Sequence, residues 1–428
     1  MTGGLMQLVA YGAQDIYLTG NSQITYFKVV YRRHTNFAME SIEQTVTGNA
    51  NFGGKISCLI SRSGDLINRV YLQANLPQVT NLSGSFRWVD DVGHHLISEV
   101  EVEIGGQRID RQTGDWLQIW SELTIAAGQK VGFRKMIGHQ PLCDSTGVLD
   151  ELSLQCYNQD DKSETTIYVP LQFWFCRNVG LSLPLIALQY HEVKINMVFR
   201  RAADVTIAAD SSDVSGLELT NVGLWVDYIY LDTDERRRFA QVSHEYLIEQ
   251  VQTTGDLSVN GTGSTSTEHL KLNFNHPVKE LVWVVQHNDL VTNKQWSNYS
   301  DSQAENDEEA RNPPGSVNPV TSAQLKLNGH DRHSTRNGEY FNWVQCYQHH
   351  TNIPDSPGIN VYSFALKPEE HQPSGSCNFS RIDNATLVLT IAYSSATLDT
   401  AQAKVRVYAV NYNVLRIMSG MGGLAYSN

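Results

Sequence analysis

The sequence of 428 residues is poor in basic residues relative to acidic ones. Its 32 lysine and arginine residues face 45 aspartate and glutamate residues, which gives a formal net charge of −13 at pH 7. A general nucleic-acid coat needs a basic footprint to neutralise phosphates, and broad docking on anionic lipid needs one too. The charge balance therefore argues against both functions and leaves open only a local basic patch.

Long apolar runs and closely spaced cysteines are also absent from the sequence. No stretch of about 18 consecutive apolar residues occurs, so we expect no transmembrane helix. The first residues lack the basic and apolar regions of a secretory signal. The six cysteines lie at least 13 residues apart, which excludes a C-x-x-C pair and zinc-ribbon spacing. We expect reduced, mostly buried thiols in a reducing compartment.

Motifs that carry catalysis or bind cofactors are incomplete in this sequence. The segment Gly48–Lys55 comes near a phosphate-binding loop, but Gly54 occupies the lysine position and Ile56 follows Lys55, so the groups that hold phosphate and magnesium are missing. His94-His95 and His330–His333 lack the helical spacing and the carboxylate of a zinc site. No G-x-S-x-G elbow occurs, although the order of a Ser–His–Asp triad varies between folds. We expect no enzymatic activity, no cofactor and no metal.

Alternation of apolar and polar residues between turn-forming residues dominates the sequence. Val100–Ile104 alternates cleanly, as expected for a half-buried β-strand. Helical periodicity is scarce, with its best example at Gly114–Ala127 and a second turn at Asp234–Ala240. This pattern favours antiparallel sandwiches or barrels over an alternating βαβ fold. Further strands are expected at 167–175, 192–199, 224–231, 281–285, 361–366, 385–393 and 405–412.

Landmarks recur in the same order in the two halves of the chain, which indicates an internal duplication. They are a polar turn that leads into a strand, a strand with a glycine turn followed by a tryptophan segment, an aromatic strand and a closing strand. A domain of roughly 200 residues with long loops fits a jelly roll better than an immunoglobulin-like domain of about 100 residues. The matched pairs are Ser63–Ile67 with Asn275–Leu281, Ile104–Arg108 with Leu327–Arg332, Asp115–Gln118 with Asn342–Gln345, Tyr168–Leu171 with Tyr362–Leu366, and Trp225–Tyr228 with Val407–Val410.

The longest polar stretch, residues 287–319, is expected to be an exposed loop. Of the five Asn-x-Ser/Thr tripeptides, the one at Asn298 lies in this loop, so Asn298 is the predicted glycosylation site. The same loop carries Trp296 and Tyr299, which are the candidates for sugar binding if the chain is instead a tandem jelly-roll lectin. The basic run Arg236–Arg238 is expected to form salt bridges at the domain junction.

Long consecutive segments of the sequence match a known family. The opening GGLMQLVAYGAQDIYLTGNSQITYFKVVYRRHTNFA (Gly3–Ala38) strongly resembles the start of the major capsid proteins of nucleocytoplasmic large DNA viruses, and most closely those of algal, chlorella-type viruses. Matching blocks continue to the end of the chain, among them LPLIALQYHEVK, YSFALKPEEHQPSGSCNFSRIDNATL and NYNVLRIMSGMGGLAYSN. The departures fall in predicted loops, so they bear on host contact and decoration rather than on the fold.

The resemblance implies an all-β fold of two tandem eight-stranded antiparallel jelly rolls with few short helices, at 25–235 and 240–428, after an N-terminal arm at 1–24. It implies a major capsid protein whose homotrimers form pseudo-hexagonal capsomers, which tile the icosahedral shell of a large double-stranded DNA virus. The arm is expected beneath the shell, against minor capsid proteins and the internal viral membrane, and neighbouring capsomers are further partners. We expect a glycosylated virion protein, assembled in the host cytoplasm, with no direct contact with nucleic acid.

Overall fold

The computed structural model describes residues 3–10, 12–138, 161–261, 264–302, 316–393 and 402–426. The chain divides into two compact units, Met1–Phe37 and Ala38–Asn428. Cys143, Cys156 and positions 303–315 of the long polar stretch lie outside the described residues. Within the described ranges, no helix has the length and apolar character needed to cross a membrane.

The first unit is an arm with little regular structure. It contains two short helices, α1 (Gly3–Val9) and α2 (Ile16–Thr19), and residues 20–36 form neither helix nor strand. Every side chain that the structure describes in this unit is exposed, except that of Asp15, which is half-buried. The unit ends at Phe37, where the first strand of the body begins, and so extends past residue 24, where the arm was expected to end.

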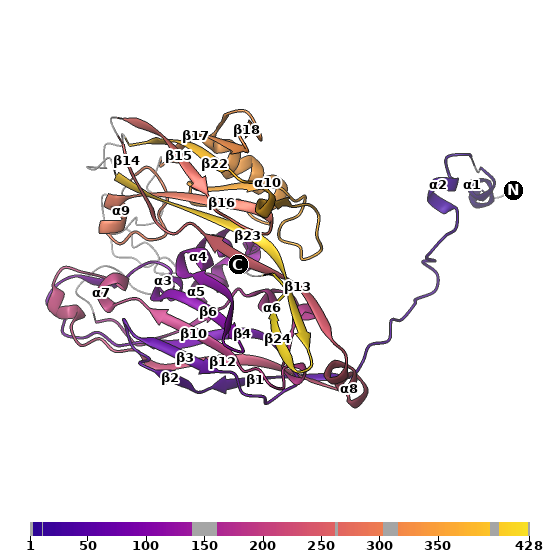
Figure 1. The fold of residues 1–428 in the computed structure, drawn as a ribbon, viewed down its shortest axis with the longest axis horizontal. Helices are drawn as coiled ribbons and strands as arrows, with labels where there is room; N and C mark the ends of the chain where they lie inside the picture. Colours follow the sequence, from indigo (N-terminus) through magenta and orange to yellow (C-terminus); the bar gives the residue numbers. More distant parts are fainter. Residues whose placement is uncertain are drawn as a thin grey trace. The chain divides into compact units, whose positions relative to one another are not determined.

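The first half of the body is a jelly roll made of two antiparallel sheets (Figure 1). One sheet has the strand order β1 (Phe37–Gln44), β12 (Thr220–Leu231), β4 (Leu66–Leu76) and β8 (Thr165–Pro170), with β9 (Leu183–Pro184) also paired to β4. The other has the order β2 (Val46–Gly48), β3 (Lys55–Leu59), β10 (Val193–Phe199), β6 (Ile97–Ile104) and β7 (Gln107–Thr113). A separate ribbon pairs β5 (Phe86–Trp88) with β11 (Thr206–Ala208).

The second half repeats this arrangement. Its first sheet has the order β13 (His244–Thr253), β23 (Gln402–Met418), β16 (Pro277–His287) and β20 (Ile359–Ser363). Its second has the order β15 (Thr265–Leu272), β22 (Ala385–Ala392), β17 (Val320–Leu327) and β18 (His330–Asp331). Four short strands extend these sheets: β14 (Leu257–Asn260), β19 (Arg336–Asn337), β21 (Cys377–Asn378) and β24 (Met421–Leu424). The expected pair of tandem jelly rolls is confirmed.

Helices are short and lie in the connections between strands. Those of the body are α3 (Val92–Leu96), α4 (Gly114–Thr124), α5 (Ala127–Met136), α6 (Trp174–Arg177), α7 (Ala202–Val205), α8 (Thr233–Gln241), α9 (Asn288–Thr292), the π-helix η4 (Tyr340–Val344) and α10 (Gln345–His349). Four 3-10 turns complete them: η1 (Val179–Leu181), η2 (Leu185–Ala187), η3 (Ser211–Val214) and η5 (Phe379–Arg381). Both helical segments expected from the sequence form, as α4 and α8. The strand expected over 167–175 ends at Pro170, because this proline cannot donate to a ladder and lies on edge strand β8.

The register of the strands shows that the two rolls repeat each other residue by residue. Leu66 at the start of β4 pairs with β9, and Pro277 at the start of β16 pairs with β21 in the same way. Five residues later, Tyr71 pairs with Trp225 in the first roll and Val282 pairs with Tyr408 in the second. Trp225 is therefore equivalent to Tyr408, one residue beyond the match with Val407 that was expected from the sequence.

The glycine turn of each half closes a two-residue hairpin. Gly105 and Gly106 have φ angles of 58° and 83°, and Asn328 and Gly329 have φ angles of 49° and 82°. Two successive residues at positive φ give the type I′ turn, whose twist matches that of the flanking strands. The same turn type therefore joins β6 to β7 and β17 to β18, as the repeat predicted.

Substitution of Gly105 tests the packing of this turn. An added Cβ at Gly105 would lie 2.3 Å from Nδ1 of His191, whereas at Gly106 the nearest such atom is 4.0 Å away. Both changes to alanine carry the cost of a left-handed residue, about 1–2 kcal/mol. We expect Gly105→Ala to lower the free energy of unfolding by at least about 1 kcal/mol more than Gly106→Ala, as measured by urea denaturation. Equal losses would contradict the close contact with His191.

Candidate functional site: the junction between the jelly rolls

Helix α4 carries the apolar stripe that joins the two rolls. The side chain of Thr113 accepts a hydrogen bond from the backbone N–H of Trp116 at 3.3 Å, and Asp115 lies in the first turn, where a carboxylate is favourable. From this start the helix presents apolar residues spaced three or four apart, which fall on one face. They are Trp116, Ile119, Trp120 and Leu123, and none is more than 4% exposed.

The apolar face of α4 packs on the outer face of the β13-β23-β16-β20 sheet of the second roll. Helix α4 and the strands β16 and β23 of this sheet are labelled in Figure 1. The rings of Trp116 and Tyr408 are 5.1 Å apart, and those of Trp116 and Trp120 are 5.6 Å apart. The receiving side chains are Val282, Val284, Ile359, Val361, Tyr408 and Val410, all buried. The junction is therefore a third hydrophobic core, which is made jointly by both rolls and is separate from the core inside each roll.

A buried carboxylate restricts how the two rolls can be oriented at this apolar contact. Asp115 of α4 lies 3.1 Å from the guanidinium of Arg200 in the first roll and 3.9 Å from that of Arg406 on β23 of the second. Arg406 also pairs with Asp256 at 2.6 Å. Burial by itself would raise the pKa of Asp115, but the two arginines hold it well below its usual range. The carboxylate is thus ionised, and its charge is balanced from both rolls.

A second buried ion cluster lies beside the first. Glu249 on β13 contacts Lys279 on β16 at 2.7 Å and Arg177 of the first roll at 3.0 Å. Burial would raise the pKa of Glu249, but a hydrogen bond with His371 and the charges of Lys279 and Arg177 lower it to about 2. The guanidinium of Arg177 also lies 4.0 Å from the centre of the Trp120 ring, so one residue connects this cluster to the apolar face of α4.

Two further contacts across the rolls involve α5 and α8. Lys130 of α5 pairs with Glu122 of α4 at 3.2 Å and also with Asp355 of the second roll, which Arg134 contacts at 3.0 Å. In the connecting helix α8, Arg236 pairs with Asp65 of the first roll at 3.0 Å. The run Arg236–Arg238 was expected to form salt bridges at the junction, and Arg236 forms this one.

The segment that follows α9 is pinned against the first roll. Lys294 donates to the backbone carbonyl of Thr206 at 2.7 Å, and the indole N–H of Trp296 donates to that of Asp204 at 2.8 Å. The hydroxyl of Ser297 is 2.8 Å from Nε2 of His95. The expectation that residues 287–319 form an exposed loop is therefore wrong for 295–300, because these residues fill a gap between the rolls.

Asn298 lies in this pinned segment and is fully buried. Its amide nitrogen donates to Oε1 of Gln295 at 3.0 Å and to the carbonyl of Ser302 at 3.1 Å, and its oxygen accepts from Ser300. A glycan could be attached only before this segment folds, so glycosylation of Asn298 stays a prediction that the folded geometry opposes. Tyr299 is 1% exposed, and Trp296 stacks against Arg200 at 4.6 Å, so the aromatic pair that the lectin alternative needs is taken up by packing.

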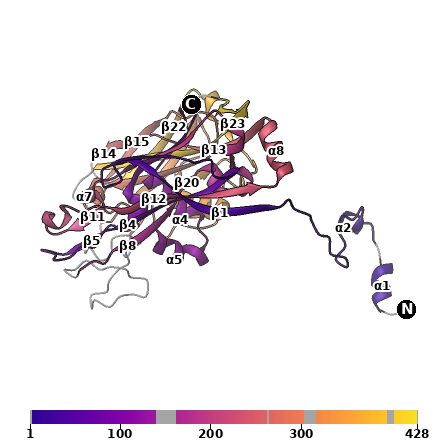
Figure 2. The same ribbon diagram turned by 90° about the horizontal axis from the view of Figure 1, so that it is seen from below.

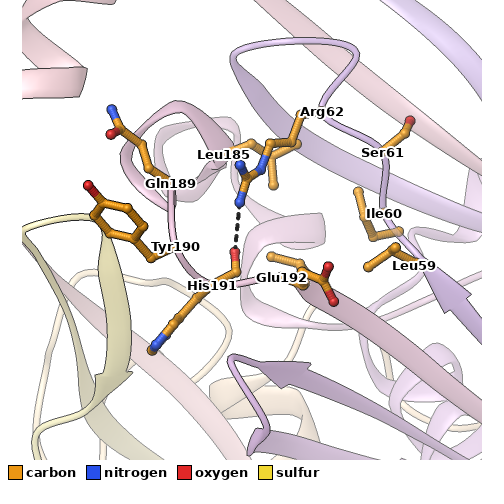
Figure 3. Close-up of a pocket in the computed structure, with 10 residues that line it drawn as sticks. Leu59, Ile60, Ser61, Arg62, Leu185, Gln189, Tyr190, His191 and Glu192 are labelled. Atoms are coloured by element: carbon orange, nitrogen blue, oxygen red, sulfur yellow. Dashed lines mark hydrogen bonds between the residues drawn. The ribbon is translucent and has the colours of Figure 1, made fainter.

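The end of the chain also contacts the first roll, at the turn that contains Tyr190 and His191. In the hairpin of β23 and β24, the carbonyl of Gly420 accepts from the N–H of Tyr190, and the carbonyl of Gly422 lies 3.0 Å from Nδ1 of His191. A surface hollow of about 380 Å³ adjoins this contact (Figure 3). Arg62 crosses it and donates to the carbonyls of Leu188 and His191 at 2.7 Å and 3.2 Å. The polar groups of the hollow thus hold the turn on which the hairpin rests.

One buried histidine of the second roll is held between two carboxylates. His350 contacts Glu280 through Nε2 and Glu369 through Nδ1, both at 2.9 Å. Burial by itself would lower the pKa of His350, but the two carboxylates raise it to about 9. The imidazolium therefore balances the buried Glu280 at neutral pH.

The charged residues of the junction were not predicted from the sequence. Asp115 and Arg406 are ordinary charged residues in a helix and a strand, and no motif marks them. The internal repeat contains one signal, because the position of Asp115 is occupied by Asn342 in the second half. A charge present in only one copy of a repeat indicates a contact that only this copy makes.

Two tandem jelly rolls held by a shared core define the chain as a double jelly-roll protein of the viral capsid class. Two family models match it in succession, one described as the major capsid protein N-terminus over residues 25–232 and the other as the large eukaryotic DNA virus major capsid protein over residues 235–423. The chain belongs to the major capsid proteins of large eukaryotic DNA viruses, and it is a structural protein of the virion shell.

Individual relatives agree along the whole chain. The major capsid protein of Pyramimonas orientalis virus is 53% identical and that of Phaeocystis pouchetii virus 50% identical, and each match covers 100% of both chains. A chain in a quasi-atomic model of the PBCV-1 virus capsid is 39% identical, with a TM-score of 0.78, over 94% of this chain and 100% of that one.

Removal of the Asp115 charge tests the ion cluster at the junction. Asp115→Asn removes the carboxylate that the half-buried Arg200 and the buried Arg406 share, and leaves Arg406 paired with Asp256 alone. Removing one partner of a buried ion pair costs about 3 kcal/mol or more. We expect a loss of that size in the free energy of unfolding, measured by chemical denaturation. The control is Arg201→Ala, which removes an exposed ion pair with Asp204 and should change little. Equal effects of the two changes would contradict the proposed role of Asp115.

The pH dependence of stability tests His350. Its pKa is about 9 in the folded chain and about 6.5 in the unfolded chain, so protonation of His350 favours folding. This contribution is fully present below pH 6.5 and is lost as the pH rises through about 9. We expect His350→Gln to flatten the fall in unfolding free energy between pH 6.5 and 9, whereas His349→Gln keeps it. An unchanged slope in the His350 variant would contradict the assignment.

Proposed function

We propose that the protein forms homotrimers whose six jelly rolls make a pseudo-hexagonal capsomer, and that these capsomers tile an icosahedral shell. Two rolls that repeat each other residue by residue support this proposal, because three copies of such a chain supply six similar building blocks. The shared core and the buried ion clusters support it further, since they fix the two rolls to each other. The fixed junction between the rolls is the observation that carries the proposal.

The arm is proposed to contact minor capsid proteins or the internal membrane beneath the shell. It exposes large apolar side chains, whose burial against a partner would be favourable. It is also basic, because residues 1–37 contain Lys28, Arg32 and Arg33 but only one acidic residue, Asp15. The exposed apolar residues include Leu5, Met6, Leu8, Val9, Ile16, Tyr17, Leu18, Tyr26, Phe27, Val29, Val30 and Tyr31. Segments of this composition suit an interaction with neighbouring proteins or with an anionic surface.

The proposed role is purely structural, with no catalytic step, cofactor or metal and no direct contact with the genome. The acidic net charge of the whole chain supports the separation from nucleic acid. The buried charged residues of the junction support the absence of catalysis, because they neutralise one another within each roll and across the two rolls. The proposal also places assembly in the host cytoplasm.

Native mass tests the trimer, and a truncated chain tests the arm. Light scattering after size exclusion should give about three times 48.0 kDa, unchanged by moderate dilution. A chain without residues 1–36, which lacks the apolar and basic residues of the arm, should keep this mass but fail to form shells under conditions in which the full chain assembles. A stable monomer of the full chain would contradict the trimer, and a truncated chain that no longer trimerises would place the arm inside the capsomer.

A further inference from the structure

We infer that the outer surface of η4 and α10 in one copy of the chain docks on the outer face of the β1-β12-β4-β8 sheet of the next copy. This inference rests on the proposed trimer and assigns the surfaces that build it. Within one chain, the first roll presents a helix and the second roll presents a sheet face, and the two meet at the junction. Among the described residues, the corresponding sheet face of the first roll receives no such helix, and the corresponding helical segment of the second roll leaves Trp343 and Tyr347 exposed.

The helical segments of the two rolls are equivalent in position and sequence. Each follows the hairpin that contains the I′ turn and precedes an edge strand, β8 or β20. Aligning Asp115 with Asn342 places the aromatic pair Trp116 and Trp120 at the positions of Trp343 and Tyr347. Their surroundings differ sharply, because Trp116 and Trp120 are 0% and 4% exposed and Trp343 and Tyr347 are 53% and 77% exposed.

The exposed helical surface forms an apolar patch, which we call the α10 patch, made of Trp343, Val344, Tyr347 and Leu366. Leu366 follows β20 in the chain and lies beside the last residue of α10, with its carbonyl oxygen 3.0 Å from Nδ1 of His349. Trp343 and Val344 belong to the π-helix η4, and π-helical turns occur frequently at functional sites. Exposed aromatic residues of this kind are typical of the centre of a protein interface.

The open sheet face of the first roll has the counterparts of the residues that receive α4. The strand register makes Tyr71 equivalent to Val282, Trp225 to Tyr408 and Tyr168 to Ile359. The three second-roll residues are buried beneath α4, whereas Tyr168 is 43% exposed and Tyr71 and Trp225 are half-buried. Strands β4, β8 and β12, which carry these three aromatic residues, can be located in Figure 2.

A second copy of the chain is the occupant that satisfies both open surfaces at once. Its sheet face receives the α10 patch of the first copy, while its own α10 patch meets the next sheet face. This contact is heterologous, so it closes into a ring when the rotation allows. A closed ring of three copies contains six rolls, as the proposed trimer requires.

The contact between copies differs in charge from the contact within the chain. Asp115 is replaced by Asn342, whose amide donates to the carbonyl of Ile359, and the position of Arg406 is occupied by Gly223. The ion pair between Asp115 and Arg406 therefore has no counterpart in the proposed interface. An interface centred on apolar and aromatic side chains should depend little on salt.

Alanine at the two aromatic positions tests the α10 patch. We expect the double variant Trp343→Ala, Tyr347→Ala to weaken trimerisation roughly tenfold or more, because aromatic residues at an interface centre dominate binding. Since both side chains are exposed, the melting point of the isolated chain should be unchanged. The matched control is Tyr190→Ala, an equally exposed aromatic residue elsewhere, at 76%. A double variant that stays trimeric at the lowest measurable concentration would overturn the inference while leaving the trimer intact.

A cross-link identifies the partner surface directly. The double variant Trp343→Cys, Tyr168→Cys should yield linked dimers and trimers after mild oxidation, whereas each single variant should not. A trimer in which the double variant gives no linked species would overturn the choice of the sheet face. A wild-type chain that is monomeric throughout would overturn the proposed function, and this inference with it.

Discussion

The burial of α4 against the second roll is the interaction on which the rest of the structure depends. Burial of two tryptophans and two aliphatic side chains is favourable but not directional, so by itself it would tolerate sliding of one roll over the other. Asp115 removes this freedom. An ionised carboxylate in a buried site is costly unless its partners are in place, and those partners come from both rolls. The junction therefore favours one arrangement of the rolls.

The same constraint explains the asymmetry between two halves that otherwise repeat each other. The repeat is retained in strand order, register and the I′ turns. It diverges where the first half must bind the second within one chain, so Asp115 faces Arg406 while Asn342 has no charged partner across a junction. The segment 294–297 is likewise used to fill the gap between the rolls, with Trp296 and Ser297 contacting the first roll. The two halves thus diverge at the contact between the rolls of one chain and resemble each other in the features that both rolls share.

The sequence predicted what depends on local patterns. Alternation of apolar residues located the strands, glycine turns located the hairpins, and the stripe Gly114–Ala127 located α4. The register of the repeat was missed by one residue at Trp225, because β23 is buried on both faces, so its apolar pattern does not show on which face a residue lies. The exposure of Asn298 was predicted wrongly, because a polar stretch can be buried when tertiary contacts satisfy its hydrogen bonds, as those of Asn298 do.

The ion clusters could not be predicted, because they join residues far apart in the sequence. Asp115 and Arg406 are separated by almost 300 positions and meet only after both rolls have formed. In the proposed trimer, the contact between the two rolls of one chain and the contact between neighbouring copies alternate around a ring and use equivalent surfaces, although only the contact within the chain has the Asp115–Arg406 ion pair. The most direct test is a cryo-EM structure of the purified capsomer, which gives the rotation from the first to the second roll and the rotation from the second roll to the first roll of the next copy. We expect two rotations of about 60°, one sixth of a full turn for each of six rolls, with equivalent contacting surfaces. Two unrelated rotations, or Trp343 facing solvent in the assembled ring, would contradict this expectation.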